Sequence, residues 1–190
     1  MDAGRLGYTA VILVLGLTML ATFAYSLFAF PERSVSDNMI HYPAYLGLLS
    51  ACLVGHILTW GLYLHAYARH DSAAVNWGYA VLLTQAVGWV GLVTNLQGTT
   101  HMVFVGIFSA AHVVAMLILC HLVHDQDLSL LLRLSLIVAL CCNILMLLLY
   151  DTQYFYLPEH VSFMFYSLYF TAFFCAQAYE DWGAYCALEE

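Results

Sequence analysis

Lysine is absent from this chain of 190 residues, and charged side chains of all kinds make up only 8% of it. Soluble domains carry about a quarter charged residues. A chain so poor in charge cannot cover the surface of a water-soluble domain, whereas its 64% hydrophobic residues suit a lipid environment. We therefore predict an integral membrane protein in which residues 1–190 form one domain.

Positive charge is scarce, because four arginines face twelve acidic residues and the formal net charge is −8. Such a chain would not bind nucleic acid, whose affinity for proteins depends on basic side chains. A disulfide framework is also excluded, since five of the six cysteines lie inside apolar runs. No two histidines stand four residues apart, and His121 with His124 ahead of Asp125 and Asp127 is only a weak ligand pattern. We predict no metal site and no cofactor.

Six long apolar runs fill the chain. A hydrocarbon core of about 30 Å needs about 20 helical residues, and continuous runs of this length favour helices over the alternating strands of a barrel. We predict an all-α bundle of six transmembrane helices with short loops. The predicted spans are 8–30, 43–68, 77–97, 102–124, 130–150 and 160–182.

The arginines predict an orientation. With six spans, Arg5, Arg69 and Arg133 fall on the side of both termini, and Arg33 falls on the opposite side. Cytoplasmic loops carry an excess of basic residues, so both termini are predicted to be cytoplasmic. The first span is too long and apolar for a secretory signal and is interpreted as a retained helix.

Connections between the spans are short, which makes successive helices antiparallel neighbours. No pair of spans is interrupted by glycine or proline as in many transporters, so a transporter is disfavoured. Gly88 and Gly91 in the third span, and Gly106 with Ala110 in the fourth, are interpreted as positions where helices approach closely.

Polar residues inside the spans are the candidates for function, because they are costly in hydrocarbon unless they face protein or a cavity. Histidines are candidate acid–base groups, and we select His101 and His112 as the candidate catalytic residues. The simpler interpretation is that each imidazole only joins two helices through a hydrogen bond. The remaining polar residues predict a seam of amides and hydroxyls without a buried carboxylate, suited to a lipid headgroup or sugar. Its predicted lipid-binding residues are His56, Gln85, Asn95, Ser109 and Asn143.

Four short stretches carry a resemblance to a known family. They are Ser34–Val35–Ser36 followed by Pro43, Leu92–Val93–Thr94 running to His101, Phe108 to His112, and Ala178 to Gly183; Arg133 is a fifth point of likeness. On these stretches the chain resembles the six-helix family of the fibroblast-growth-factor-receptor-activating protein, the damage-regulated autophagy modulators and the yeast Sfk-type proteins. It looks most like the branch of the post-GPI-attachment factor two.

The resemblance implies a role in remodelling the lipid of glycosylphosphatidylinositol (GPI) anchors in the Golgi or endoplasmic reticulum. Two departures put catalysis in doubt. Gln85 stands where that branch tends to have an acidic residue, and the run from Phe163 to Cys175 lacks the Glu, Asn and His of its last helix. The chain would then keep the fold and not the chemistry.

Two hypotheses remain open. The first is a lipid-remodelling factor whose partner is a membrane lipid. The alternative is a non-enzymatic accessory subunit that binds the transmembrane helices of other membrane proteins. The sequence does not decide between them.

Overall fold

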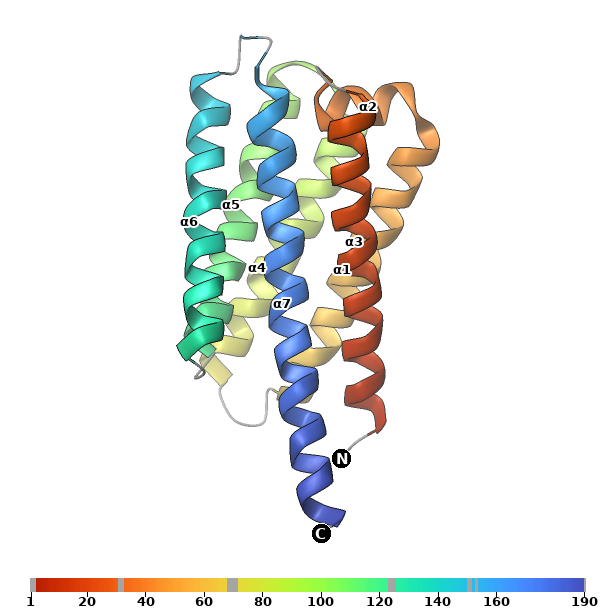
Figure 1. The fold of residues 1–190 in the computed structure, drawn as a ribbon. Coiled ribbons are helices and arrows are strands. Elements are labelled where there is room, and N and C mark those ends of the chain that lie inside the picture. Colours follow the sequence, from red (N-terminus) through yellow and green to blue (C-terminus); the bar gives the residue numbers. More distant parts are fainter. Residues whose placement is uncertain are drawn as a thin grey trace.

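A computed structural model describes residues 3–30, 33–67, 72–122, 126–149, 152 and 154–189. Within these residues the protein is all-α, with seven helices and no strand (Figure 1). The helices are α1 (Ala3–Ala29), α2 (Val35–His41), α3 (Pro43–Tyr67), α4 (Ser72–Thr94), α5 (Gly98–Leu122), α6 (Gln126–Leu148) and α7 (Tyr156–Glu189).

Helix α2 lies where the sequence predicted only a connection. Ser34 caps it, because the Ser34 hydroxyl accepts the Asp37 N–H at 3.0 Å while the Asp37 carboxylate accepts the Ser34 N–H at 3.4 Å. This reciprocal arrangement is the capping box, which satisfies two backbone donors at a helix start. Pro43 then begins α3, and the two helices meet at 120°. A short polar helix gives no apolar run, so hydropathy alone missed it.

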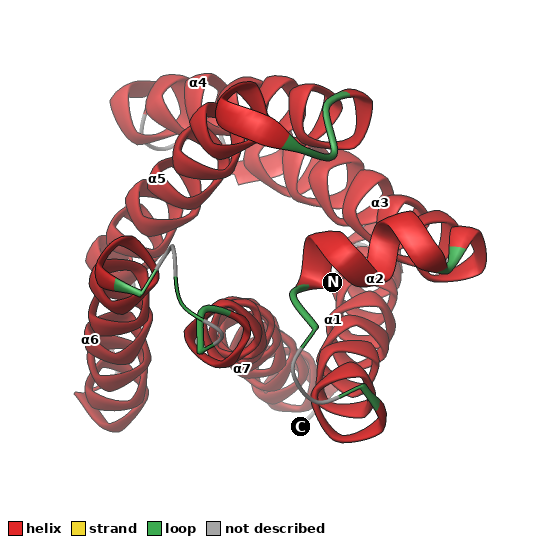
Figure 2. Ribbon diagram, turned by 90° about the horizontal axis from the view of Figure 1, so that it is seen from above, coloured by secondary structure: helices red, strands yellow, loops and turns green. Residues whose placement is uncertain are grey.

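The long helices stand side by side with both chain termini at one end of the bundle (Figure 1). Helix α2 and the connections α4–α5 and α6–α7 lie at the opposite end, which we call the loop end. Seen from above, α7 lies between α6 and α1, and α5 lies between α4 and α6 (Figure 2). The most extensive contacts join α7 to α1 and to α6, and α4 to α5. Helix α7 is thus central to the packing.

The interior is built largely from aromatic side chains. Trp60, Tyr169, Phe108 and Phe173 are among the largest fully buried residues. The outer faces are apolar as well, with Leu147, Leu148 and Phe28 among the most exposed side chains. Apolar residues facing both inward and outward are what a bilayer requires, because lipid tails are as apolar as the core.

Three helices contain segments long and apolar enough to cross a membrane: Val75–Thr94, Gly98–Cys120 and Leu130–Leu148. The bent pair Val35–His41 and Pro43–Leu58 makes a fourth if it is taken as one span. Among the described residues the chain therefore has three such helices, or up to four, and the prediction of six stays a proposal.

The glycines divide into two kinds. A Cβ on Gly88 would lie 3.1 Å from the Phe108 backbone, and one on Gly91 would overlap the Phe104 ring, so both allow α4 and α5 to approach closely, as predicted. The same prediction is wrong for Gly106, whose added Cβ would meet nothing within 4 Å. Gly106 instead borders a groove.

Candidate functional site

A groove opens between α5 and α6 near the loop end. It encloses about 410 Å³, within the range of about 300–1,000 Å³ typical of small-molecule sites. Its walls are mostly aliphatic, with Phe155 from the α6–α7 connection at one end. Two polar side chains, Ser109 and Asn143, interrupt these walls. The groove therefore brings together two of the five predicted lipid-binding residues.

Asn143 is fixed by its amide nitrogen. Nδ2 donates to the Ala139 carbonyl at 2.9 Å and to the Tyr166 hydroxyl at 2.5 Å. Because a carbonyl oxygen only accepts, this contact also fixes which end of the amide is nitrogen. Asn143 Oδ1 is buried and accepts no hydrogen bond. The groove thus contains an acceptor that the protein itself does not satisfy.

Ser109 supplies the second polar group and is only 8% exposed. Its hydroxyl makes no hydrogen bond of normal geometry, although the Tyr166 hydroxyl lies near both Ser109 and Ser162. Tyr166 has one proton to donate and already accepts the Asn143 N–H, so it cannot satisfy both serines. At least one serine hydroxyl in this cluster is left without a partner.

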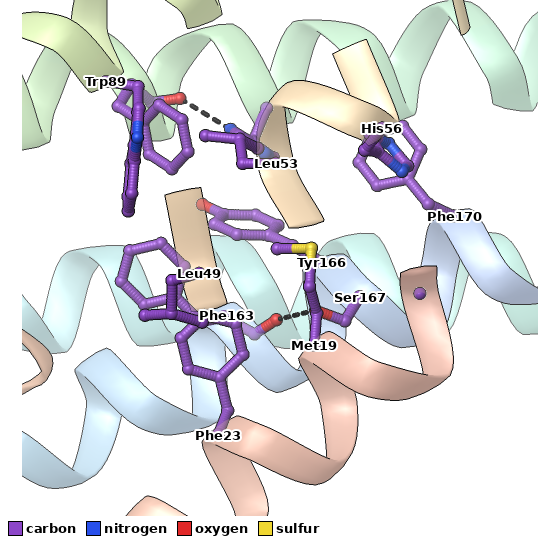
Figure 3. A pocket seen from close by; sticks show the side chains of 13 residues that line it. Met19, Phe23, Leu49, Leu53, His56, Trp89, Phe163, Tyr166, Ser167 and Phe170 are labelled. Carbon is purple, nitrogen blue, oxygen red and sulfur yellow. Dashed lines mark hydrogen bonds between the residues drawn. The ribbon is translucent and has the colours of Figure 1, made fainter. Parts of the chain in front are cut away.

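The other predicted residues lie elsewhere. His56 and His112 border a small central cavity of about 20 Å³, room for about one water molecule. Figure 3 shows His56 beside Phe170, with Trp89, Phe163 and Tyr166 around the same cavity. The centroids of the His56 and Phe170 rings are 4.8 Å apart, in an edge-to-face arrangement.

Gln85 and Asn95 also lie outside the α5–α6 groove. Gln85 is 1% exposed, and neither of its amide atoms has a hydrogen-bond partner. Asn95 donates to the Gly91 carbonyl at 2.9 Å and lies at a separate hollow of about 430 Å³ formed by α4 and α5. The five predicted lipid-binding residues therefore do not line one continuous seam.

The two predicted catalytic histidines are far apart. His112 Nδ1 donates to the Phe108 carbonyl at 2.9 Å, and its ring packs 4.9 Å from that of Tyr166. His101 lies in the first turn of α5, eleven residues earlier, which is about 16 Å along the helix. A single substrate atom cannot meet both imidazoles.

His101 belongs to a polar cluster at the loop end. Gly98, at φ +81°, allows the tight turn into α5 that brings His101 Nδ1 within 2.8 Å of the Asn95 carbonyl. Nδ1 therefore carries the proton, and in the neutral imidazole Nε2 accepts a hydrogen bond from the Ser36 hydroxyl at 2.7 Å. The Ser36–His101 pair joins α2 to α5.

Sequence reasoning missed the carboxylate in this cluster. Glu159, in the first turn of α7, is 2% exposed and accepts the Val35 N–H at 2.7 Å. The prediction that no carboxylate is buried is thus wrong. Burial raises the pKa of Glu159 to about 8, against the opposing effect of the Val35 hydrogen bond; nearby Asp37 raises it further. Glu159 precedes the last predicted span by one residue, and hydropathy treats such a position as surface.

The neighbouring His160 completes a second buried chain of hydrogen bonds. His160 Nδ1 donates to the Tyr156 carbonyl at 2.8 Å, so its Nε2 accepts from the Ser26 hydroxyl at 2.9 Å. Asn38 Nδ2 donates to the same Ser26 oxygen at 2.7 Å. This chain joins α1, α2 and α7. Because its members are fully buried and no cavity of the described residues opens onto them, we interpret it as structural.

Metal-ligating groups do not gather anywhere in the part of the chain that was searched for them, which is the described part. The weak pattern around His124 and Asp125 lies outside the described residues. No protein-family model, curated protein or solved structure matches this chain. The resemblance to the GPI-remodelling branch therefore rests on its short motifs alone.

Proposed function

We propose that this chain is a multi-pass membrane protein that binds a membrane lipid in the groove between α5 and α6. One observation carries the proposal: the groove is lined by aliphatic side chains and contains two incompletely hydrogen-bonded polar groups, Ser109 and Asn143. An apolar pocket with a few polar groups that fix orientation is the usual form of a small-molecule site. On a helix bundle surrounded by lipid, a lipid is the ligand at hand.

Six spans are part of the proposal. Helix α1 has 27 residues and α7 has 34, so each is at least about 40 Å long and can cross a core of about 30 Å. Both termini lie at the same end of the bundle, which supports an even number of spans (Figure 1). We place both termini in the cytoplasm on the arginine distribution, and the loop end in the lumen of the Golgi or endoplasmic reticulum.

The family resemblance gives the proposed biological role, which is to handle lipid during the remodelling of GPI anchors. The separation of His101 from His112 supports binding over catalysis by these two residues. In this proposal the chain presents or protects a lipid, and His112 packs the core beside the groove.

Groove filling tests lipid binding. The full chain is purified in mild detergent, and bound lipid is measured by extraction and mass spectrometry. Gly106→Leu places a side chain in the groove without a clash. Gly47→Leu is the matched control, since Gly47 is also helical and an added Cβ there also meets nothing within 4 Å. We expect the first variant to lose most of its bound lipid and the control to keep it.

Equal lipid content in the wild type and the folded Gly106→Leu variant would overturn the proposal. So would stoichiometric co-purification of other membrane proteins that only Gly106→Leu abolishes, which would favour the accessory-subunit alternative. The GPI role has its own test. Cells lacking this chain should show altered acyl chains on their GPI-anchored proteins, and unaltered chains would remove that role while leaving lipid binding intact.

A further inference from the structure

The polar groups of the α5–α6 groove specify the chemistry of its ligand more narrowly than "lipid". They are an unsatisfied acceptor, Asn143 Oδ1, and a serine hydroxyl with a proton to donate. Both belong to a buried cluster, where an unmade hydrogen bond costs about 1–3 kcal/mol. A ligand that satisfies them must offer a donor and an acceptor side by side.

We propose that the groove selects a single long hydrocarbon chain that ends in a hydroxyl or an amide N–H, over the same chain ending in an ester. This inference rests on the proposed lipid-binding function and adds the ligand's polar group. A hydroxyl or amide donates to Asn143 Oδ1 and accepts from Ser109. An ester has acceptors only, so it would leave Asn143 Oδ1 bare.

The size of the groove favours one chain. Its volume of about 410 Å³ is near the lower end for small-molecule sites. The aliphatic walls from Val105, Val113, Val114, Leu140 and Leu147 have no charged side chain among them, so a charged headgroup would find no counter-ion there. The polar end of the ligand is therefore neutral.

The rigidity of the acceptor supports selectivity. Asn143 cannot rotate its amide to present a donor, because Nδ2 is held by both Ala139 and Tyr166. Fixed polar groups discriminate well against a ligand that lacks the matching donor, since the buried group is then left unpaired. The preference should therefore depend on Asn143 more than on the walls.

The test compares three probes of one chain length on the full protein in detergent: oleyl alcohol, oleamide and methyl oleate. Binding is measured by native mass spectrometry after delipidation. We expect the alcohol and the amide to bind about tenfold more tightly than the ester, as expected when one buried acceptor is left unpaired. In Asn143→Leu, which keeps the volume and removes the acceptor, the three affinities should become equal.

Tyr166→Phe is the control, because it removes one Asn143 contact and leaves the Oδ1 acceptor in place. It should keep the preference for the alcohol. If the three probes bind the wild type equally and Gly106→Leu abolishes all three, the groove binds lipid and the proposed selectivity is wrong. If none of the probes binds, the lipid-binding function fails and this inference with it.

Discussion

The carboxylate of Glu159, in the first turn of α7, accepts a hydrogen bond from the backbone N–H of Val35, the first residue of α2. The two residues are 124 positions apart in the chain. The first N–H groups of a helix have no partner within it, so this contact satisfies a donor that would otherwise be buried and unpaired. With the Ser36–His101 bond, it fixes α2 across the loop end of the bundle.

Removing the Glu159 acceptor should destabilise the protein. In Glu159→Ala the Val35 N–H loses its partner in a buried site, at a cost of about 1–3 kcal/mol. For a chain of this size that corresponds to a fall in Tm of roughly 2–12 °C. Glu159→Gln keeps an acceptor oxygen and should lose less. Thermal unfolding in detergent measures both, and an Ala variant as stable as the wild type would contradict the role given to this bond.

Stability should depend on pH through Glu159. Its pKa is raised to about 8 in the folded protein, mainly by burial, whereas the unfolded chain releases the proton near 4.5. Between these values the folded state holds more protons than the unfolded state, so stability falls as pH rises from about 4.5 to 8. The neighbouring Asp37, His101 and His160 also titrate. The difference between the wild type and Glu159→Gln isolates the Glu159 contribution, and parallel pH profiles would refute it.

Energetic coupling should follow the hydrogen bonds, not the histidine type. A double-mutant cycle between Ser36→Ala and His101→Ala should show coupling of about 1 kcal/mol, because the two side chains are bonded at 2.7 Å. A cycle between Ser36→Ala and His112→Ala should be additive, since His112 lies about 16 Å from His101 along α5. Comparable coupling in both cycles would mean that the two histidines act together after all.

The two kinds of glycine should respond differently to alanine. Gly106→Ala enters open space and should stabilise α5 by up to about 1 kcal/mol through helix propensity. Gly88→Ala gains the same propensity, but its Cβ would lie 3.1 Å from backbone and side-chain atoms of Phe108, so α4 and α5 must move apart. We expect Gly88→Ala to lower Tm and Gly106→Ala to leave it unchanged or raise it. The opposite order would reject the close α4–α5 approach.

Topology can be tested in sealed microsomes. With six spans and cytoplasmic termini, protease added outside should remove epitope tags from both ends, while an N-glycosylation acceptor placed in the 31–34 segment should be glycosylated. Protection of one terminus alone would require an odd number of spans.

The sequence by itself determined the class of protein and the positions of its helices. Long apolar runs must satisfy their backbone hydrogen bonds internally in lipid, so they become helices wherever they later pack. The polar positions Ser109 and Asn143 could also be selected from the sequence, because polar atoms in hydrocarbon must face inward or toward a cavity. The GPI-remodelling role stays a prediction that no comparison tests.

Only the tertiary structure decided which of these residues meet. In a soluble helix the contrast between an apolar and a polar face tells which side is buried, but here both faces are apolar and the contrast disappears. Gly88 and Gly106 therefore look alike in sequence, although one lies against Phe108 and the other borders a groove. Glu159 looks like a surface residue beside a predicted span until α2 folds over it and buries it. Such meetings depend on packing between distant segments, which local hydropathy does not encode.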